Sequence, residues 1–428
     1  MLSILALALT STHHSPPSFF ETPDANVFSY RAPERTQPIR LHLARDKNSL
    51  VLLDGGVVAR KAPWASVAKI RISGPNFTDT TLSIDYSTGS IDVPIDYSPG
   101  SLGAKTDNRL IISGGIDKAS THYPISAHSG LIRFGNSSIS YHNLTPILDF
   151  TAVGMYTFNV TSSVVNIVDG TSNAGNPTTL VNDGSTSQFE QTTIQNKTSV
   201  ILNSNTAGAS VSLNNPHAAQ GMTSLGVNDA AGGAQINVAP MALPLSVTGF
   251  GAANPSYLSL DFTGTTNPAV TITNSNANGV SGSFTFSNRA AVSFTNVFLP
   301  APTVSSVNPN NGPVSGGTNI TILGSHFIGT SSVTIGGTPV TTFTVTSDTS
   351  LSATTAQRLP AASGLSVLVT TPGGTSASNT LFSYAAVTQT PISNTALLTL
   401  AGLLAAAGWW MLERRSKVRE PFKNCGSH

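Results

Sequence analysis

Short runs in which apolar and polar residues alternate recur along most of the chain, and each run is closed by Gly, Pro, Asn or Asp. Alternation with a period of two is typical of a strand with one buried face, and the closing residues favour turns. The runs include AKIRISG (68–74), TLSIDYS (81–87), IDVPIDY (91–97), RLIISGG (109–115), GLIRFG (130–135), MYTFNV (155–160) and VVNIVDG (164–170). They begin roughly every 10 to 25 residues, which predicts an all-β protein.

Two architectures fit this rhythm, a β-solenoid and a multi-strand sandwich. We favour a solenoid-like body over residues 37–299, because stacked coils satisfy one another's backbone groups. Inward-facing Val, Ile and Leu then form a continuous core that needs no charged residues. The stretch LHLARDKNSLVLLDGGVVARKAP predicts a strand pair at its start, with a turn at Asp54-Gly55-Gly56.

Composition excludes several classes of function. Charged residues make up 10% of the chain, against about 25% in ordinary soluble proteins. With 21 basic and 20 acidic side chains the formal net charge is +1, too small to attract nucleic acid. The only cysteine is Cys425, so neither an intrachain disulfide nor a Cys-based zinc site is available. We expect no cofactor, no metal and no nucleic-acid partner.

Three acids are weak candidates for a ligand site: Asp85, Asp92 and Asp96. Asp92 and Asp96 are four residues apart in a predicted strand and would share a face, as paired catalytic carboxylates do. Pro94 lies between them, and the same alternation is typical of a solvent-facing surface. We therefore expect contact with calcium or carbohydrate at most, and we do not expect an enzyme.

Histidines and motifs give no further support for catalysis. His122, His128 and His142 are scattered among predicted loops without the short spacing of a metal site. The chain also lacks a GxSxG elbow, an HExxH helix and a phosphate-binding loop.

The body resembles a known class of proteins over residues 37–227. IRLHLARDKNSLVLLDGGVVARKAP, VAKIRISGPNFTDTTLSIDYSTGSIDVPIDYSPG and YHNLTPILDF are similar to the repetitive regions of large secreted bacterial surface proteins. This resemblance implies a β-helical stalk or an adhesin-like body, and it implies no activity.

Residues 300–386 resemble the immunoglobulin-like IPT/TIG domain. The resemblance is carried by Asn311-Gly312-Pro313 with Ser315-Gly316-Gly317, then NITILGSHF, VTIGGTPV, TSDTSLSATT and VLVTTPGGTSA. Gly336-Gly337 predicts a two-residue hairpin turn, and Phe327, Phe343 and Phe382 are expected to fill the sandwich interior. The resemblance implies a binding or spacer module. No basic loop accompanies it, which disfavours the DNA-contacting variant.

The C-terminus contains an apolar stretch that predicts a membrane-spanning helix at 395–412, after a linker at 387–394. Eighteen uncharged residues form about 27 Å of helix, close to the thickness of a bilayer core. Trp409 and Trp410 would lie at the interface, and Arg414 and Arg415 begin a basic tail at 413–428. By the positive-inside rule this tail is cytoplasmic and the rest of the chain lies outside.

The ends of the chain also carry targeting features. Pro391, the apolar helix, the Trp pair and the Arg pair resemble C-terminal sorting tails of the IPTL-CTERM and PEP-CTERM kind, which a membrane protease recognises. A plain membrane anchor is the alternative. Residues 1–36 are expected to be a leader, and MLSILALALT resembles the apolar core of a truncated signal peptide.

These features predict an exported bacterial surface protein, structural or adhesive, whose partners are a membrane, a sorting protease, and extracellular polysaccharide or surface proteins. The alternative is an extracellular polysaccharide-degrading β-helix enzyme with a TIG accessory module. Convergence of Asp85, Asp92 and Asp96 in a groove would favour the enzyme.

Overall fold

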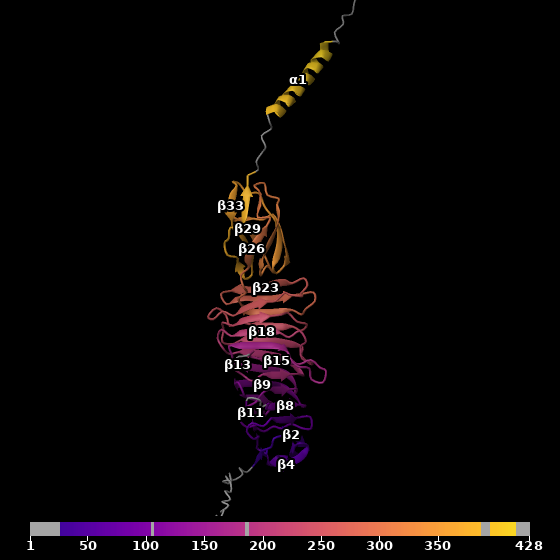
Figure 1. Ribbon diagram of the computed structural model, residues 1–428, viewed down its shortest axis with the longest axis vertical. Helices are drawn as coiled ribbons and strands as arrows, with labels where there is room; N and C mark the ends of the chain where they lie inside the picture. Colours follow the sequence, from indigo (N-terminus) through magenta and orange to yellow (C-terminus); the bar gives the residue numbers. More distant parts are fainter. Residues whose placement is uncertain (1–25, 104–106, 185–187, 387–393, 417–428) are drawn as a thin grey trace, which may run out of the picture.

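The computed structural model describes residues 26–103, 107–184, 188–386 and 394–416, and its regular secondary structure consists mostly of β-strands (Figure 1). Residues 26–299, called the body below, form an elongated stack of strands. Residues 300–386 form a smaller β-domain beyond the end of this stack, and helix α1 (Asn394–Ser416) follows.

Two large sheets, here called A and B, make up the body. Sheet A has the spatial order β1 (Val27–Arg31), β5 (Lys69–Ser73), β7 (Ile95–Ser98), β11 (Ser137–Tyr141), β10 (Ser129–Phe134), β9 (Ile116–Ser126), β13 (Ala152–Val160), β17 (Lys197–Ser204), β19 (Ser224–Asp229), β21 (Leu245–Thr248), β25 (Val292–Val297), β24 (Gly279–Thr285), β23 (Ala269–Asn276). Sheet B has the order β22 (Tyr257–Leu260), β20 (Gln235–Val238), β18 (Ser210–Asn214), β14 (Val164–Asp169), β15 (Thr179–Asn182), β16 (Thr192–Ile194), β12 (Ile147–Asp149), β8 (Arg109–Ser113), β6 (Thr80–Asp85), β2 (Ile39–Asp46), β3 (Ser49–Asp54), β4 (Val57–Pro63). A short 3-10 helix, η1 (Trp64–Ser66), follows β4.

The chain passes repeatedly from one sheet to the other, and most neighbouring strands within a sheet are parallel. Because parallel pairing is in register, equivalent residues of successive strands stack in columns. One inward column of sheet A is Tyr156, Val200, Leu225, Leu245 and Val292. One inward column of sheet B is Val165, Val211, Ile236 and Leu258. All of these side chains are buried. Complete burial of one large apolar side chain stabilises the folded state by about 1.5–3 kcal/mol.

The outward columns are polar. On sheet A, Asn159 pairs with Asn203 and Asn203 with Asn228, and their side-chain amides bond across the strands at 2.8 and 3.3 Å. On sheet B, Ser212, Asn237 and Ser259 form the equivalent column. Alternation along each strand therefore separates an apolar interior from two faces rich in hydroxyls and amides.

The first strand corrects one expectation. Val27–Arg31 pairs in parallel with β5, and Phe28 and Ala32 are buried in the core. The folded body thus begins inside the range 1–36 that we assigned to a leader, because Phe28 fills the end of the apolar interior. Residues 1–25, including the apolar MLSILALALT, lie outside the described residues.

Residues 300–386 form a β-sandwich with a separate core. Its strands are β26 (Thr303–Asn308), β27 (Asn311–Pro313), β28 (Asn319–Ser325), β29 (Ser332–Ile335), β30 (Thr338–Pro339), β31 (Thr342–Ser347), β32 (Ser350–Thr354), β33 (Ala362–Leu365), β34 (Val367–Thr371), β35 (Gly374–Thr375) and β36 (Phe382–Ala385). Phe327 and Phe382 are fully buried in this core and Phe343 packs against it. Gly336 and Gly337 both have positive φ, as the predicted hairpin requires.

The small domain packs directly on the last strands of the body. Ile328 belongs to the same apolar cluster as Phe284 and Leu260 of the body, and Leu299 packs against that cluster. Gly329 lies so close to Val270 that a side chain there would overlap it. The small domain therefore covers the end of the body's core, which would otherwise be open to water.

Helix α1 forms where an apolar helix was expected. Among the residues that the structure describes, however, no helix combines the length and hydropathy needed to cross a membrane. The membrane span predicted at 395–412 is therefore not supported. Residues 387–393, most of the predicted linker, lie outside the described residues.

Candidate functional site

The three candidate acids do not converge. Asp85 ends β6 on sheet B, and its Oδ1 accepts a hydrogen bond from the Ser87 backbone at 2.8 Å. Asp96 is in β7 on the other sheet, where Lys69 Nζ lies 4.0 Å from its carboxylate. Asp92 lies between these strands, in residues that we had predicted as strand and that the structure places outside β7. The prediction that Asp92 and Asp96 share one face of a strand is therefore wrong.

Asp92 instead lines a cavity of about 160 Å³, here called the turn pocket. Strands β6, β8 and β12 are parallel neighbours in sheet B, so the segments that follow them stack at one edge. Those segments contribute Tyr86, Gly114-Gly115 and Thr151 to the wall. Asp117 and Phe134 come from strands of sheet A and complete it. Sequence reasoning missed Asp117, because only the stacking of coils brings it near Asp92.

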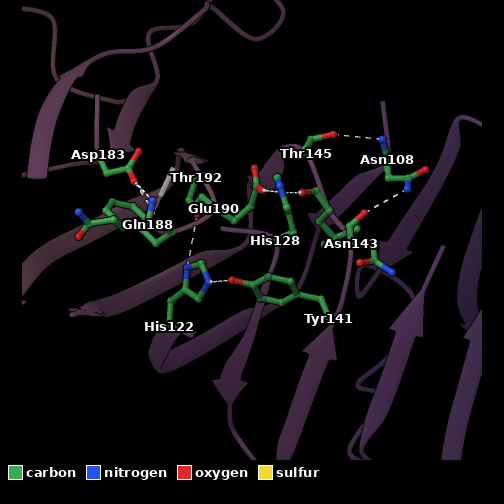
Figure 2. Close-up of polar contacts among 12 residues, drawn as sticks. Asn108, His122, His128, Tyr141, Asn143, Thr145, Asp183, Gln188, Glu190 and Thr192 are labelled. Atoms are coloured by element: carbon green, nitrogen blue, oxygen red, sulfur yellow. Dashed lines mark hydrogen bonds and ion pairs between the residues drawn. The ribbon is translucent and has the colours of Figure 1, made fainter. Parts of the chain in front are cut away.

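A layer of buried polar side chains, which includes His122, Asp149, Glu190 and Lys197, crosses the middle of the body. Figure 2 shows part of this layer. His122 is fully buried on the inward face of β9, and its Nε2 lies 2.8 Å from the Tyr141 hydroxyl. The ring centroids of His122 and Phe158 are 4.7 Å apart, and the two rings pack edge to face. Tyr141 and Phe158 belong to two different apolar clusters, so His122 lies where one cluster gives way to the next. Burial lowers the pKa of His122 to about 3, which keeps the imidazole neutral.

His122 corrects the expectation that these histidines lie in loops. The alternation in STHYPIS places Ser120, His122 and Pro124 on one face, and all three are buried. The sequence therefore contains the alternation of a strand here, although the polar residues of the segment obscure it.

Glu190 is a buried acid of this layer. Its side chain is 3% exposed, and its Oε2 lies 3.3 Å from Nδ1 of the half-exposed His128 (Figure 2). Burial, with a smaller contribution from nearby Asp183, raises the pKa of Glu190 to about 9. The carboxyl is therefore protonated at neutral pH.

Lys197 and Asp149 form a fully buried ion pair. The distance from Lys197 Nζ to Asp149 Oδ1 is 2.7 Å, and the ammonium also donates to the Thr151 carbonyl at 2.6 Å and hydroxyl at 2.8 Å. Burial lowers the pKa of Lys197, and Asp149 opposes that effect. Thr151 connects this pair with the turn pocket, because it also lines the pocket wall.

Perturbed pKa values can mark a catalytic centre, but three of the ionisable groups in this layer are buried away from solvent. His122, Asp149 and Lys197 are each at most 1% exposed, and each has a hydrogen-bond partner within the core. In the described part of the chain, no group of three His, Cys, Asp or Glu side chains is placed to hold a metal ion. We interpret the layer as a structural feature that fixes which coils stack on which, a role attested for buried polar groups.

Gly130 shows how tightly this layer is built. A Cβ at Gly130 would overlap the Tyr141 hydroxyl, which His122 holds in place, and would lie 2.7 Å from the Tyr123 carbonyl. We expect Gly130→Ala to lower the free energy of unfolding by about 1–3 kcal/mol, measured by urea denaturation. Gly226→Ala is the control, because the nearest atom there is the Ser246 hydroxyl at 3.0 Å, which can rotate away. Equal losses in the two variants would contradict this reading.

The residues of the predicted tail are only partly described. Trp409 and Trp410 are 74% and 57% exposed on α1, and the Arg414 guanidinium lies 4.2 Å from the Trp410 ring centroid. Leu398, Leu403 and Leu404 are about as exposed as the tryptophans. Pro391 and the side chain of Arg415 lie outside the described residues.

The fold thus defines an all-β protein with a long two-sheet body and a β-sandwich module at its end. Residues 302–384 match the IPT/TIG domain family, which confirms the resemblance seen in the sequence. The curated proteins compared with the chain give no match.

Three solved structures are similar to part of the chain. The Plexin A4 extracellular region is 20% identical over 24% of this chain and 11% of its own, with a TM-score of 0.19. SGBP-B from a complex xyloglucan utilization locus in Bacteroides uniformis is 29% identical over 24% and 29%, with a TM-score of 0.18. SGBP-B of the Bacteroides ovatus mixed-linkage glucan utilization locus, in complex with a mixed-linkage heptasaccharide, is 20% identical over 25% and 30%, with a TM-score of 0.16. The chain therefore spans less than a third of each of these proteins.

Proposed function

We propose that this chain is a non-enzymatic, exported cell-surface protein with a structural or adhesive role. In this proposal the body is a β-solenoid stalk, the TIG domain caps the stalk and extends it, and α1 belongs to a C-terminal tail that directs the protein to the cell envelope. Extracellular polysaccharide or other surface proteins are the partners.

The character of the body's two outer faces carries this proposal. In-register columns of Asn, Ser and Thr give long polar surfaces, such as the asparagine ladder Asn159, Asn203 and Asn228. Such faces offer repeated hydroxyl and amide groups to a polymer, and they keep an extended stalk soluble with few charges. Asp85 and Asp96 lie on different sheets, so these two acids do not supply the paired carboxylates of a glycosidase.

The exposed apolar residues of α1 support the proposed targeting role. A helix whose Leu and Trp side chains face water is unfavourable unless lipid or another protein covers it. A cation beside a Trp ring, as Arg414 is beside Trp410, suits the interface between membrane and water. We propose that a membrane or a membrane-bound sorting protease covers this helix.

Cell fractionation tests the localisation. An epitope tag inserted after Ala386 reports the folded part of the chain, and a matched variant lacks residues 394–428. We expect the complete chain in the envelope fraction, where external protease removes the tag from intact cells. The shortened variant is expected to leave that fraction for the medium or the periplasm. Complete chain found in the soluble cytoplasm, with its tag protected, would contradict the proposal.

A further inference from the structure

The proposed surface role does not say what the turn pocket binds. We propose that it binds one neutral hexose unit of an extracellular polysaccharide, an assignment that rests on the proposed function. Its volume of about 160 Å³ is below the roughly 300–1,000 Å³ of pockets for drug-sized ligands. This size suits a ligand no larger than one sugar ring.

One wall of the pocket is bare backbone. Gly114 and Gly115 both have positive φ, and a Cβ at Gly115 would lie 2.8 Å from Cβ of Tyr86. Only glycine adopts this geometry without strain, so the wall carries no side chain that would fill the cavity. Thr151 and Ala152, the next coil's contribution, are also small.

The opposite sides combine aromatic and acceptor groups. Tyr86 and Phe134 pack edge to face with ring centroids 4.6 Å apart, which gives the apolar surface on which the C–H groups of a sugar pack. Asp92 accepts a hydrogen bond from the Ser90 hydroxyl at 2.6 Å, and Asp117 accepts one from the Lys118 backbone at 2.6 Å. In each case the bond uses one carboxylate oxygen and leaves the other to accept from a ligand hydroxyl.

The same lining argues against two other ligands. Among the residues that the structure describes, no Lys or Arg lines the pocket, so an acidic sugar would meet two carboxylates without compensation. A calcium ion takes six to eight oxygen ligands, with several acidic side chains usually among them. Among the described residues, no group of three His, Cys, Asp or Glu side chains is placed to hold a metal ion. A neutral polyhydroxylated ring satisfies the acceptors without either difficulty.

Titration calorimetry on the purified full-length chain tests the assignment. The probes are cellohexaose, mannohexaose, a β-1,4-galactohexaose and, separately, calcium chloride. We expect saturable binding of at least one hexasaccharide, weakened at least about tenfold by Asp92→Asn and by Asp117→Asn, since each removes a charge-assisted acceptor. Asp96→Asn is the matched control, because Asp96 does not line the pocket, and this variant should bind as the unmodified chain does. Thermal unfolding of each variant shows that it is folded.

Several outcomes would overturn the assignment: no saturable binding of any of the three sugars, binding of calcium alone, or equal effects of pocket and control variants. Release of new reducing ends from a bound hexasaccharide would contradict the non-enzymatic role. If fractionation finds the chain at the cell surface but calorimetry finds no sugar binding, only the pocket assignment is refuted. If the chain binds sugar but is confined to the cytoplasm, only the surface role is refuted.

Discussion

Lys197→Met is expected to lower the free energy of unfolding by about 3–5 kcal/mol. Lys197 and Asp149 are at most 1% exposed, so removing the cation leaves a buried carboxylate without its counter-ion. The ammonium's bonds to the Thr151 carbonyl and hydroxyl are lost as well. Urea denaturation measures the difference.

Two controls separate a buried pair from ion pairing in general. The double variant Lys197→Met with Asp149→Asn should recover part of the loss, because the amide carries no charge and can still accept from the Thr151 backbone. Lys69→Met removes the partner of Asp96 in a half-exposed pair at 4.0 Å, and should cost at most about 1 kcal/mol. A similar small loss for Lys197→Met would show that the buried pair is not a determinant of stability.

Glu190 is expected to make the stability depend on pH. Its pKa is about 9 in the folded chain against 4.5 for the ordinary carboxyl. Between these values the folded state holds a proton that the unfolded state has released, so stability falls as the pH rises. The contribution is complete below pH 4.5 and is lost as the pH approaches 9. The slope is about 1.4 kcal/mol per pH unit.

Comparison with Glu190→Gln isolates this effect. From pH 6.5 to 8.5 the unmodified chain should lose about 3 kcal/mol more unfolding free energy than the variant, since glutamine does not titrate. Urea denaturation at three pH values across this range gives the two slopes. Glu34→Gln, an exposed carboxyl, should leave the slope unchanged. Parallel slopes for Glu190→Gln and the unmodified chain would refute a protonated Glu190.

His122 acts in the opposite direction at lower pH. Its pKa is lowered from 6.5 to about 3, so the unfolded state takes up a proton that the folded state does not. Stability from this group is present above pH 6.5 and is lost as the pH falls toward 3. Measurements above pH 6.5 therefore report Glu190 without interference from His122.

Much of the fold could be predicted from the sequence because its signals are local. Alternation in TLSIDYS gives Leu82 and Ile84 as buried and Ser83 as partly exposed, and the structure agrees. Gly336-Gly337 fixes a hairpin through φ values that only glycine adopts readily. The prediction for IDVPIDY was less accurate, since β7 starts only at Ile95, immediately after Pro94. Proline lacks the N–H that a central strand donates.

The sequence by itself determined the mostly-β class and the TIG domain. It also determined the buried face of strands with clear alternation, such as Leu82 and Ile84 in TLSIDYS, because that face depends on neighbours two residues apart. Only the tertiary structure decided that Asp92 and Asp117 line one pocket, that Asp85 and Asp96 lie on different sheets, and that Lys197 pairs with Asp149. These three arrangements depend on which strands lie next to one another in each sheet. That stacking is set by turn geometry and burial across 25 to 48 positions of the chain, over which local periodicity carries no information.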